Sequence, residues 1–198
     1  MRVILASGSP RRKQLMELVG IECEVMATNV DEPITKNAQL LVRELSEKKN
    51  QAACKIIQSK PINEDTIVIT ADTLVSFEDK VLEKPNSSEE AFEMLKMLSG
   101  NKHTVYTGVV ITKLSRGCFE KILLEDSADV FFRELADDEI NAYIKTGEPF
   151  DKAGAYGVQE KGALLVEKVH GDFYTVVGLP IMKVGYVLSQ MGVDIWKA

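Results

Sequence analysis

Two arginines stand at the start of a predicted helix, directly after a short predicted strand at residues 3–6. The segment reads Ser7-Gly8-Ser9-Pro10-Arg11-Arg12. The free backbone amides of a helix start carry partial positive charge, and guanidinium groups bind phosphate oxygens through two donors at once. Cations at this end of a helix are otherwise unfavourable. The spacing therefore indicates an anion site, and solvated surface arginines are an equally good interpretation of the spacing alone.

One carboxylate, Asp72, follows a β-branched run at residues 66–70 that is typical of a buried strand. We expect that strand to end at Ala71-Asp72-Thr73. Ligand sites in α/β sheets favour the carboxyl ends of strands, where a carboxylate could bind a divalent metal or accept a proton from water. A turn or cap residue is the commoner role of a single Asp.

Lysines and a glycine-rich segment add further candidates. Lys49 lies on a predicted helix, and Lys84 follows a predicted strand. Most lysines are solvated, so these two count only together with Asp72 and the arginines. The connection at residues 147–159 combines acids, a lysine, aromatic rings and several glycines, which permit close approach of a ligand to the backbone. Its Gln159 could read the edge of a base through its amide, whereas an ordinary structured loop with buried aromatic rings is the alternative.

Several common catalytic motifs are absent from the sequence. The chain has only two histidines, and no GxxxxGK[ST] or GxGxxG segment occurs. A histidine-rich metal site and a serine-hydrolase triad are therefore not expected. Phosphate chemistry would have to use scattered carboxylates, lysines and arginines together with a divalent ion.

The elements that must position these residues alternate between helix and strand. Helices are expected at 10–20, 37–59, 88–98, 134–146 and 180–191, and strands at 3–6, 66–70, 74–82 (a hairpin), 104–114, 119–124, 127–132 and 163–169. Interleaved helices and central hairpins predict an α/β fold with a mixed sheet.

Composition narrows the class of protein further. The 198 residues suit a single domain, and 24 basic against 30 acidic residues give a net charge of -6, which argues against a nucleic-acid partner. The three cysteines are far apart, so a reduced, cytoplasmic setting is expected. Apolar runs are too short for a signal peptide or a membrane span, so no membrane partner is expected.

Taken together, these segments resemble the Maf (Maf-like) nucleotide pyrophosphatase family over nearly the whole chain. The matching motifs follow one another in order: residues 5–12, Asp31-Glu32, 71–73, 82–85, 98–100 with His103 and Thr107, 147–157 with Gln159, and 176–180. The resemblance implies an inosine triphosphatase-like fold, in which an elongated mixed sheet with flanking helices forms two lobes around a deep cleft within one domain, residues 1–198. It also implies cleavage of a nucleoside triphosphate to the monophosphate and pyrophosphate with Mg²⁺ or Mn²⁺, and a homodimer.

The same resemblance implies a role for each candidate residue. Asp72 corresponds to the proton acceptor. The residues that correspond to phosphate-binding positions are Ser9, Arg12, Lys49, Lys84 and Lys152. Those that correspond to metal ligands are Glu32, Asp72 and Asp151. Those that correspond to determinants of base preference are Arg11, Thr73 and Gln159. The last three are similar to the branch that prefers dTTP and UTP. The pair Lys48-Lys49 leaves open which lysine faces the cleft. A non-catalytic regulator of cell division and septum formation, binding a nucleotide or a protein, is the rival reading.

Overall fold

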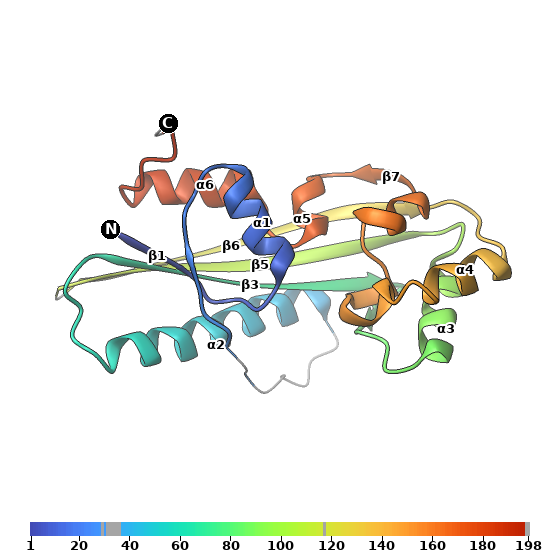
Figure 1. The fold of residues 1–198 in the computed structure, drawn as a ribbon, viewed down its shortest axis with the longest axis horizontal. Helices are drawn as coiled ribbons and strands as arrows, with labels where there is room; N and C mark the ends of the chain where they lie inside the picture. The colour runs from blue at the N-terminus through green and yellow to red at the C-terminus, as the bar shows by residue number, and fades with distance from the viewer. Residues whose placement is uncertain (29, 31–36, 117, 197–198) are drawn as a thin grey trace.

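The computed structural model describes residues 1–28, 30, 37–116 and 118–196 and contains one mixed sheet. Seven strands form it in the order β2-β1-β3-β5-β6-β7, with β4 paired to β3 (Figure 1). Their bounds are β1 Arg2–Leu5, β2 Glu24–Val25, β3 Thr66–Phe77, β4 Lys80–Leu82, β5 Lys102–Ser115, β6 Cys118–Phe132 and β7 Val166–His170. Among the described strands, only the pairs β1–β2 and β1–β3 are parallel. The predicted α/β fold with a mixed sheet is confirmed.

Helices cover both faces of this sheet. Helix α2 lies along one face, while α1, α5 and α6 lie on the other, and α3 and α4 gather at one end (Figure 1). Their bounds are α1 Pro10–Leu18, α2 Ala38–Gln58, α3 Ser88–Leu98, α4 Asp137–Ile144, α5 Phe173–Val177 and α6 Ile181–Gln190. None of the helices in the described ranges combines the length and the apolar character that crossing a membrane requires.

Strand β3 is longer than the sequence predicted, and this corrects the position of Asp72. The strand runs through Asp72, which pairs with Gly108 of β5 in an unbroken antiparallel register. The expected end at residues 71–73 is therefore wrong. A charged residue interrupts the apolar pattern but not the ladder, because strands pair through their backbones.

The predicted break between strands 119–124 and 127–132 is wrong for the same reason. Strand β6 continues through Glu125 and Asp126, which pair with Gly108 and Thr107. The Asp126 carboxylate is compensated from a distant element, by an ion pair of 3.0 Å with Lys183 of α6. A local sequence pattern cannot reveal an ion pair with a residue that is distant in the sequence.

Strands β1 and β4 pair with different stretches of the same edge of β3, and the stretch between them is open. Strand β1 ends at Leu5, opposite Ile69, and β4 begins to pair only at Val75. Among the described strands, residues 70–74 of β3 thus have a partner only on the β5 side. The strand end that lies beside Asp72 is therefore that of β1 and not that of β3. Side chains from both faces of β3 can reach the gap that follows β1.

Close contact between α2 and the sheet fixes the height of this helix over the open edge. A Cβ atom on Gly108 would lie 2.6 Å from the carbonyl oxygen of Val42, so only glycine fits beneath the helix. The Thr70 hydroxyl donates to the carbonyl of Ser46 at 2.8 Å, less than one turn before Lys49. Asn37 caps the start of α2 by accepting from the Leu40 amide, as its type favours.

The remaining predictions differ mainly in their bounds. The helix expected at 134–146 is α4, Asp137–Ile144, and the strand expected at 163–169 is a 3-10 helix, Glu160–Leu164, followed by β7. The connection at 147–159 contains two further 3-10 helices, Glu148–Asp151 and Ala153–Ala155. Strand β2 and helix α5 were not predicted, because both are only a few residues long.

Candidate functional site

A cavity of about 430 Å³ lies at the open edge of β3. Every predicted site residue that the structure describes lines it: Ser9, Arg11, Arg12, Lys49, Asp72, Thr73, Lys84, Asp151, Lys152 and Gln159. Glu32, the remaining one, lies outside the described residues. Segments from five distant parts of the sequence therefore meet in one place.

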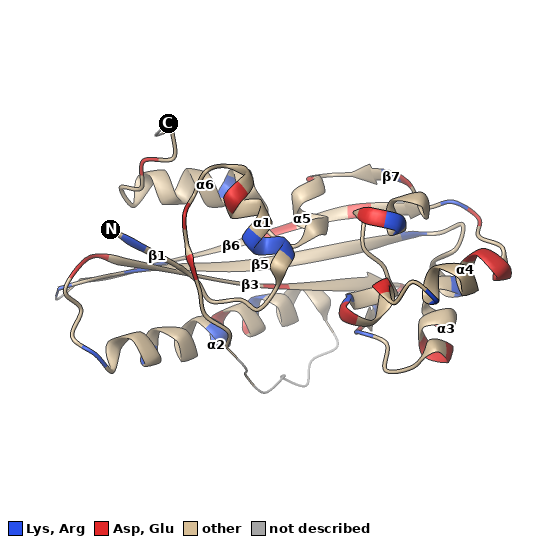
Figure 2. Ribbon diagram, in the orientation of Figure 1, with Lys and Arg blue, Asp and Glu red and all other residues tan. Residues whose placement is uncertain are grey.

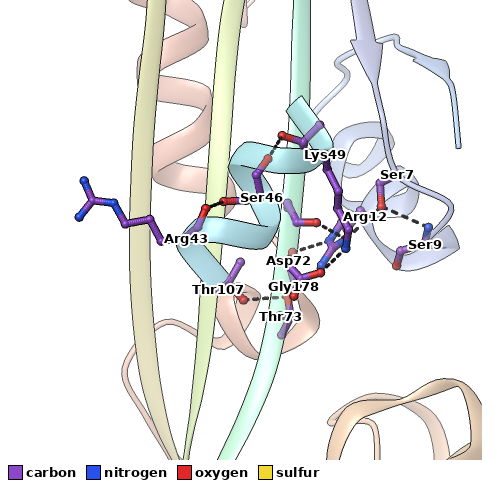
Figure 3. A network of polar contacts seen from close by, with 12 residues as sticks. Ser7, Ser9, Arg12, Arg43, Ser46, Lys49, Asp72, Thr73, Thr107 and Gly178 are labelled. Carbon is purple, nitrogen blue, oxygen red and sulfur yellow. Dashed lines mark hydrogen bonds and ion pairs between the residues drawn. The ribbon is translucent and has the colours of Figure 1, made fainter. Parts of the chain in front are cut away.

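Lys49 and Asp72 approach each other across the gap between α2 and β3. The Lys49 ammonium donates to the Asp72 carboxylate, and the two side chains point toward one another (Figure 3). Lys48 is exposed on the outside of α2, whereas Asn50 is buried and donates weakly to carbonyls of the sheet. The helix period thus settles which lysine faces the cavity: it is Lys49.

Arg12 is buried and holds together three segments of the cavity wall. Its Nε donates to the Gly178 carbonyl at 2.8 Å, and one terminal nitrogen donates to Ser7 Oγ at 3.0 Å and to the Ala71 carbonyl at 2.9 Å. The other terminal nitrogen donates to Thr73 Oγ1 at 3.0 Å (Figure 3). These bonds use four of the five N–H donors of a guanidinium. One donor is left without a partner among the described residues.

Burial lowers the pKa of Arg12, and the nearby carboxylate of Asp72 acts against this effect. A guanidinium stays charged in either case. The bond to Ala71 satisfies a carbonyl on the open edge of β3 that lacks a strand partner.

A second charged cluster closes the other side of the cavity. The Asp151 carboxylate accepts from Arg11 at 2.8 Å and from the Lys152 ammonium at 2.7 Å. Burial alone would raise the pKa of Asp151, but the hydrogen bonds from Lys152 and Arg11 outweigh it and lower that pKa. Lys152 also donates to the Glu148 carbonyl at 2.8 Å. A Cβ on Gly157 would lie 2.7 Å from Lys152 Cε, so glycine at this position leaves room for the aliphatic part of the lysine side chain.

Ser9 occupies the N-cap position of α1 but does not cap it. Its side chain makes no capping hydrogen bond, although serine is a residue type that favours this position, and Pro10 follows at the first helical position. The Ser9 amide instead donates to Ser7 Oγ at 3.3 Å. Ser7, which the sequence reasoning did not single out, thus organises the turn, and the Ser9 hydroxyl is left at the cavity wall.

The cavity is divided between charge and apolar surface. Among the described residues that line it, the cations are Arg11, Arg12, Lys49, Lys84 and Lys152, and the acids are Asp72, Asp151 and Glu160, so five positive charges face three negative ones there. Figure 2 shows the basic first turn of α1 that contributes to this excess. The chain as a whole carries -6, so the local excess marks a place for an anion.

Apolar side chains line the part of the cavity on the α5 face of the sheet: Val75, Val105, Tyr156, Val158, Val176 and Val177. Tyr156 is buried, its hydroxyl lies 2.7 Å from His103 Nε2, and burial raises its pKa, so the phenol stays neutral. Gln159 forms no side-chain hydrogen bond within the described part of the chain. An apolar wall beside a free amide is suited to a flat, polar-edged ring.

The carboxylates have the ligand chemistry that Mg²⁺ and Mn²⁺ prefer, since both ions bind oxygen. Asp72 and Asp151 supply such oxygens to the same cavity. Within the described ranges, no three His, Cys, Asp or Glu side chains gather closely enough to hold a metal by themselves. The donor set therefore fits a cation that shares its ligands with a bound phosphate.

The fold and cavity define an α/β protein with a cationic site that has room for a phosphorylated ring compound. The sequence profile of the Maf-like protein family matches residues 2–191, and the chain belongs to this family.

Three relatives extend the match to nearly full length. A protein of Caldicellulosiruptor saccharolyticus is 43% identical over 202 residues, which cover 99% of this chain and 98% of the relative. One of Caldicellulosiruptor bescii is 44% identical with the same coverage, and one of Bacillus cereus is 42% identical over 100% of this chain and 99% of its own. Each is named dTTP/UTP pyrophosphatase.

Proposed function

We propose that this protein hydrolyses dTTP and UTP between the α- and β-phosphates, giving the nucleoside monophosphate and pyrophosphate. The observation that carries the proposal is the excess of cations around Asp72 in a cavity whose other part is apolar. A triphosphate matches the cations, and a pyrimidine ring matches the apolar part. The names of the relatives support the same substrates.

The charged residues act by neutralising and positioning the triphosphate. Lys49, Lys84, Lys152 and Arg12 compensate the charge that develops on the departing pyrophosphate. Ser9 adds a hydroxyl at the start of α1. Fixed donors of this kind need no rearrangement during the reaction, which is why they lower its barrier.

Asp72 is the proposed proton acceptor for the attacking water. Its carboxylate is held by Lys49, so its direction is fixed before substrate binds. Deprotonated water attacks the α-phosphorus, the bond to the bridging oxygen breaks, and pyrophosphate leaves with both electrons of that bond. Among the described residues that line the cavity, Asp151 is the other aspartate, and its pairing with Arg11 and Lys152 suits charge balance better than proton transfer.

Asp72, Asp151 and Glu32 would hold a divalent cation, which would supply Lewis-acid compensation of the phosphate charge. The carboxylates at hand fit that ion. Arg11, Thr73 and Gln159 are the proposed determinants of base preference.

A panel of nucleotides tests the proposal. Purified protein is incubated with dTTP, UTP, CTP, GTP and 7-methyl-GTP, with Mg²⁺ or Mn²⁺ or with a chelator, and pyrophosphate release is followed. Metal-dependent release that is fastest with dTTP and UTP supports the enzyme. Tight nucleotide binding without turnover would favour the rival, a non-catalytic regulator.

A further inference from the structure

A chain of hydrogen bonds runs behind the cavity wall from a guanidinium to a carbonyl. Arg12 donates to Thr73 Oγ1 at 3.0 Å, and Thr73 Oγ1 lies 2.9 Å from Thr107 Oγ1 (Figure 3). Thr107 in turn donates to the Thr175 carbonyl at 2.8 Å. Thr107 is fully buried and is the cross-strand partner of Thr73. Thr107 itself does not line the cavity, whereas Thr73 does.

The two ends of this chain determine its direction. A carbonyl oxygen can only accept, so the single hydroxyl proton of Thr107 points to Thr175. The proton in the contact between the two hydroxyls must therefore come from Thr73. At the other end a guanidinium can only donate, so Arg12 occupies one lone pair of Thr73.

Thr73 is consequently left with one lone pair and no proton to offer. It can accept a hydrogen bond from a ligand but cannot donate one. The hydroxyl cannot turn freely, since a reversal would leave the buried Thr107 oxygen facing another oxygen without a proton between them.

The position of Thr73 suits contact with a base. It lies on the α5 face of β3, the same face as Val75 and opposite to that of Asp72, because side chains alternate along a strand. Gly178, at φ 122°, keeps the space beside the hydroxyl clear, since a Cβ there would lie 3.3 Å from Thr73 Oγ1. The apolar part of the cavity begins at this place.

We propose that Thr107 is a positioning residue that selects the base by making Thr73 an obligate acceptor. This inference rests on the proposed function. Uracil and thymine carry an N–H donor at ring N3, which an obligate acceptor satisfies. Cytosine carries a lone pair at N3, which would face the lone pair of Thr73. The device therefore favours UTP and dTTP over CTP, through a residue that the substrate does not touch.

A purely structural role for Thr107 would affect all nucleotides alike. The discriminating quantity is therefore the ratio of kcat/KM for UTP to that for CTP. Thr107→Val keeps the shape of the side chain and removes the oxygen, which frees the Thr73 proton to turn toward the ligand. Thr107→Ser keeps the hydroxyl and is the matched control.

The expected result is a fall of about tenfold in the UTP:CTP ratio of Thr107→Val, the size of one reversed hydrogen bond. The ratio of Thr107→Ser stays within about twofold of wild type. An unchanged ratio in a folded Thr107→Val protein, or an equal fall in Thr107→Ser, would overturn the proposal. Thr107→Ala removes the same oxygen and replaces the valine variant if thermal melting shows that the latter is unfolded.

A measurement on the wild-type protein tests the proposal even if the Thr107 variants do not fold. UTP methylated at N3 lacks the donor, so wild type should turn it over no faster than CTP. Turnover of N3-methyl-UTP at the rate of UTP would overturn the proposal. Absence of pyrophosphate release from UTP itself would instead contradict the proposed function, so the two failures are distinguishable.

Discussion

The ammonium of Lys49 on α2 is paired with the carboxylate of Asp72 in the middle of β3, at the open edge of the sheet. About a quarter of the lysine side chain remains exposed to the cavity, at 24%, so the pair is accessible to a ligand. The pair joins the proposed proton acceptor to the charges that would surround a triphosphate, and the first two predictions concern its members.

Replacing Asp72 by Asn removes the proton acceptor while keeping its shape. We expect kcat for UTP to fall at least a hundredfold, since proton transfer contributes about 10²–10⁴-fold to such reactions. Thermal unfolding should change little, because Lys49 can turn toward solvent. Asp137→Asn is the control, since Asp137 pairs with Lys96 on the surface far from the cavity. Undiminished turnover in Asp72→Asn would contradict the assignment of Asp72 as the proton acceptor.

Adjacent lysines provide a matched pair for the second prediction. Lys49→Gln removes a cation from the cavity, whereas Lys48→Gln removes one from the exposed side of the same helix. We expect kcat/KM for UTP to fall by about a hundredfold in the first variant, as for the loss of one preorganised donor, and to stay near wild type in the second. Equal effects in steady-state kinetics would show that general charge, not position, matters.

Arg12 should matter for stability as well as for activity. Its four hydrogen bonds join β3, α1 and the turn after α5. Lysine carries its donors on one nitrogen and cannot span these acceptors, so Arg12→Lys should lower the free energy of unfolding by about 3 kcal/mol. Arg11→Lys, which keeps a cation beside Asp151, should stay within about 1 kcal/mol of wild type in urea unfolding. The account of Arg12 as a clamp fails if both variants unfold alike.

Gly157→Ala tests how Lys152 is positioned. The new Cβ would lie 2.7 Å from Lys152 Cε, so the flexible end of the lysine must leave its bonds to Asp151 and Glu148. We expect KM for UTP to rise about tenfold, the effect of one charge-assisted bond, with little change in melting temperature. Gly185→Ala in α6 is the control, since its nearest neighbour would be 3.9 Å away. An unaltered KM would contradict this packing argument.

His103 predicts a pH dependence of stability. Burial lowers its pKa from 6.5 to about 4, although Asp129 acts in the opposite direction. The unfolded chain therefore binds a proton between pH 6.5 and 4 that the folded chain does not bind. The stabilisation is complete above pH 6.5 and is lost as the pH falls toward 4, by about 3 kcal/mol at most.

Urea unfolding at several pH values measures this loss. His103→Asn should flatten the curve between pH 6.5 and 4. The hydrogen bonds from Arg133 lower the pKa of Glu139 from 4.5 to about 2, so its contribution is lost between pH 4.5 and 2, mostly below the histidine window. A curve that His103→Asn does not alter in that window would contradict the prediction.

Local signals predicted most helices and the ends of several. Asn37 and Ser87 accept from the amides three residues on, as residue types favoured at helix starts do, and helix α3 has the expected bounds, 88–98. Two strands were cut short where a charge interrupted the apolar run, one at Asp72 and one at Asp126. Their compensating partners, Lys49 and Lys183, come from helices distant in sequence, so no local pattern reveals them.

The same limit applies to the candidate site. Motif resemblance selected described residues that do line one cavity, which lies at the open edge of β3. It did not predict that Arg12 uses four of its N–H donors in hydrogen bonds within the protein. It also did not predict that Ser7 accepts one of these bonds, or that Thr107 forms hydrogen bonds behind the cavity wall. Those relations depend on which way each side chain points across β3. The homodimer stays a prediction, checkable by sedimentation.

The position of bond cleavage is the central claim, and isotope labelling tests it most directly. UTP is hydrolysed in water enriched in ¹⁸O, and the products are analysed by mass spectrometry and ³¹P NMR. Attack of water at the α-phosphorus predicts one ¹⁸O atom in UMP and none in pyrophosphate. Release of orthophosphate with UDP, or ¹⁸O in pyrophosphate, would contradict it.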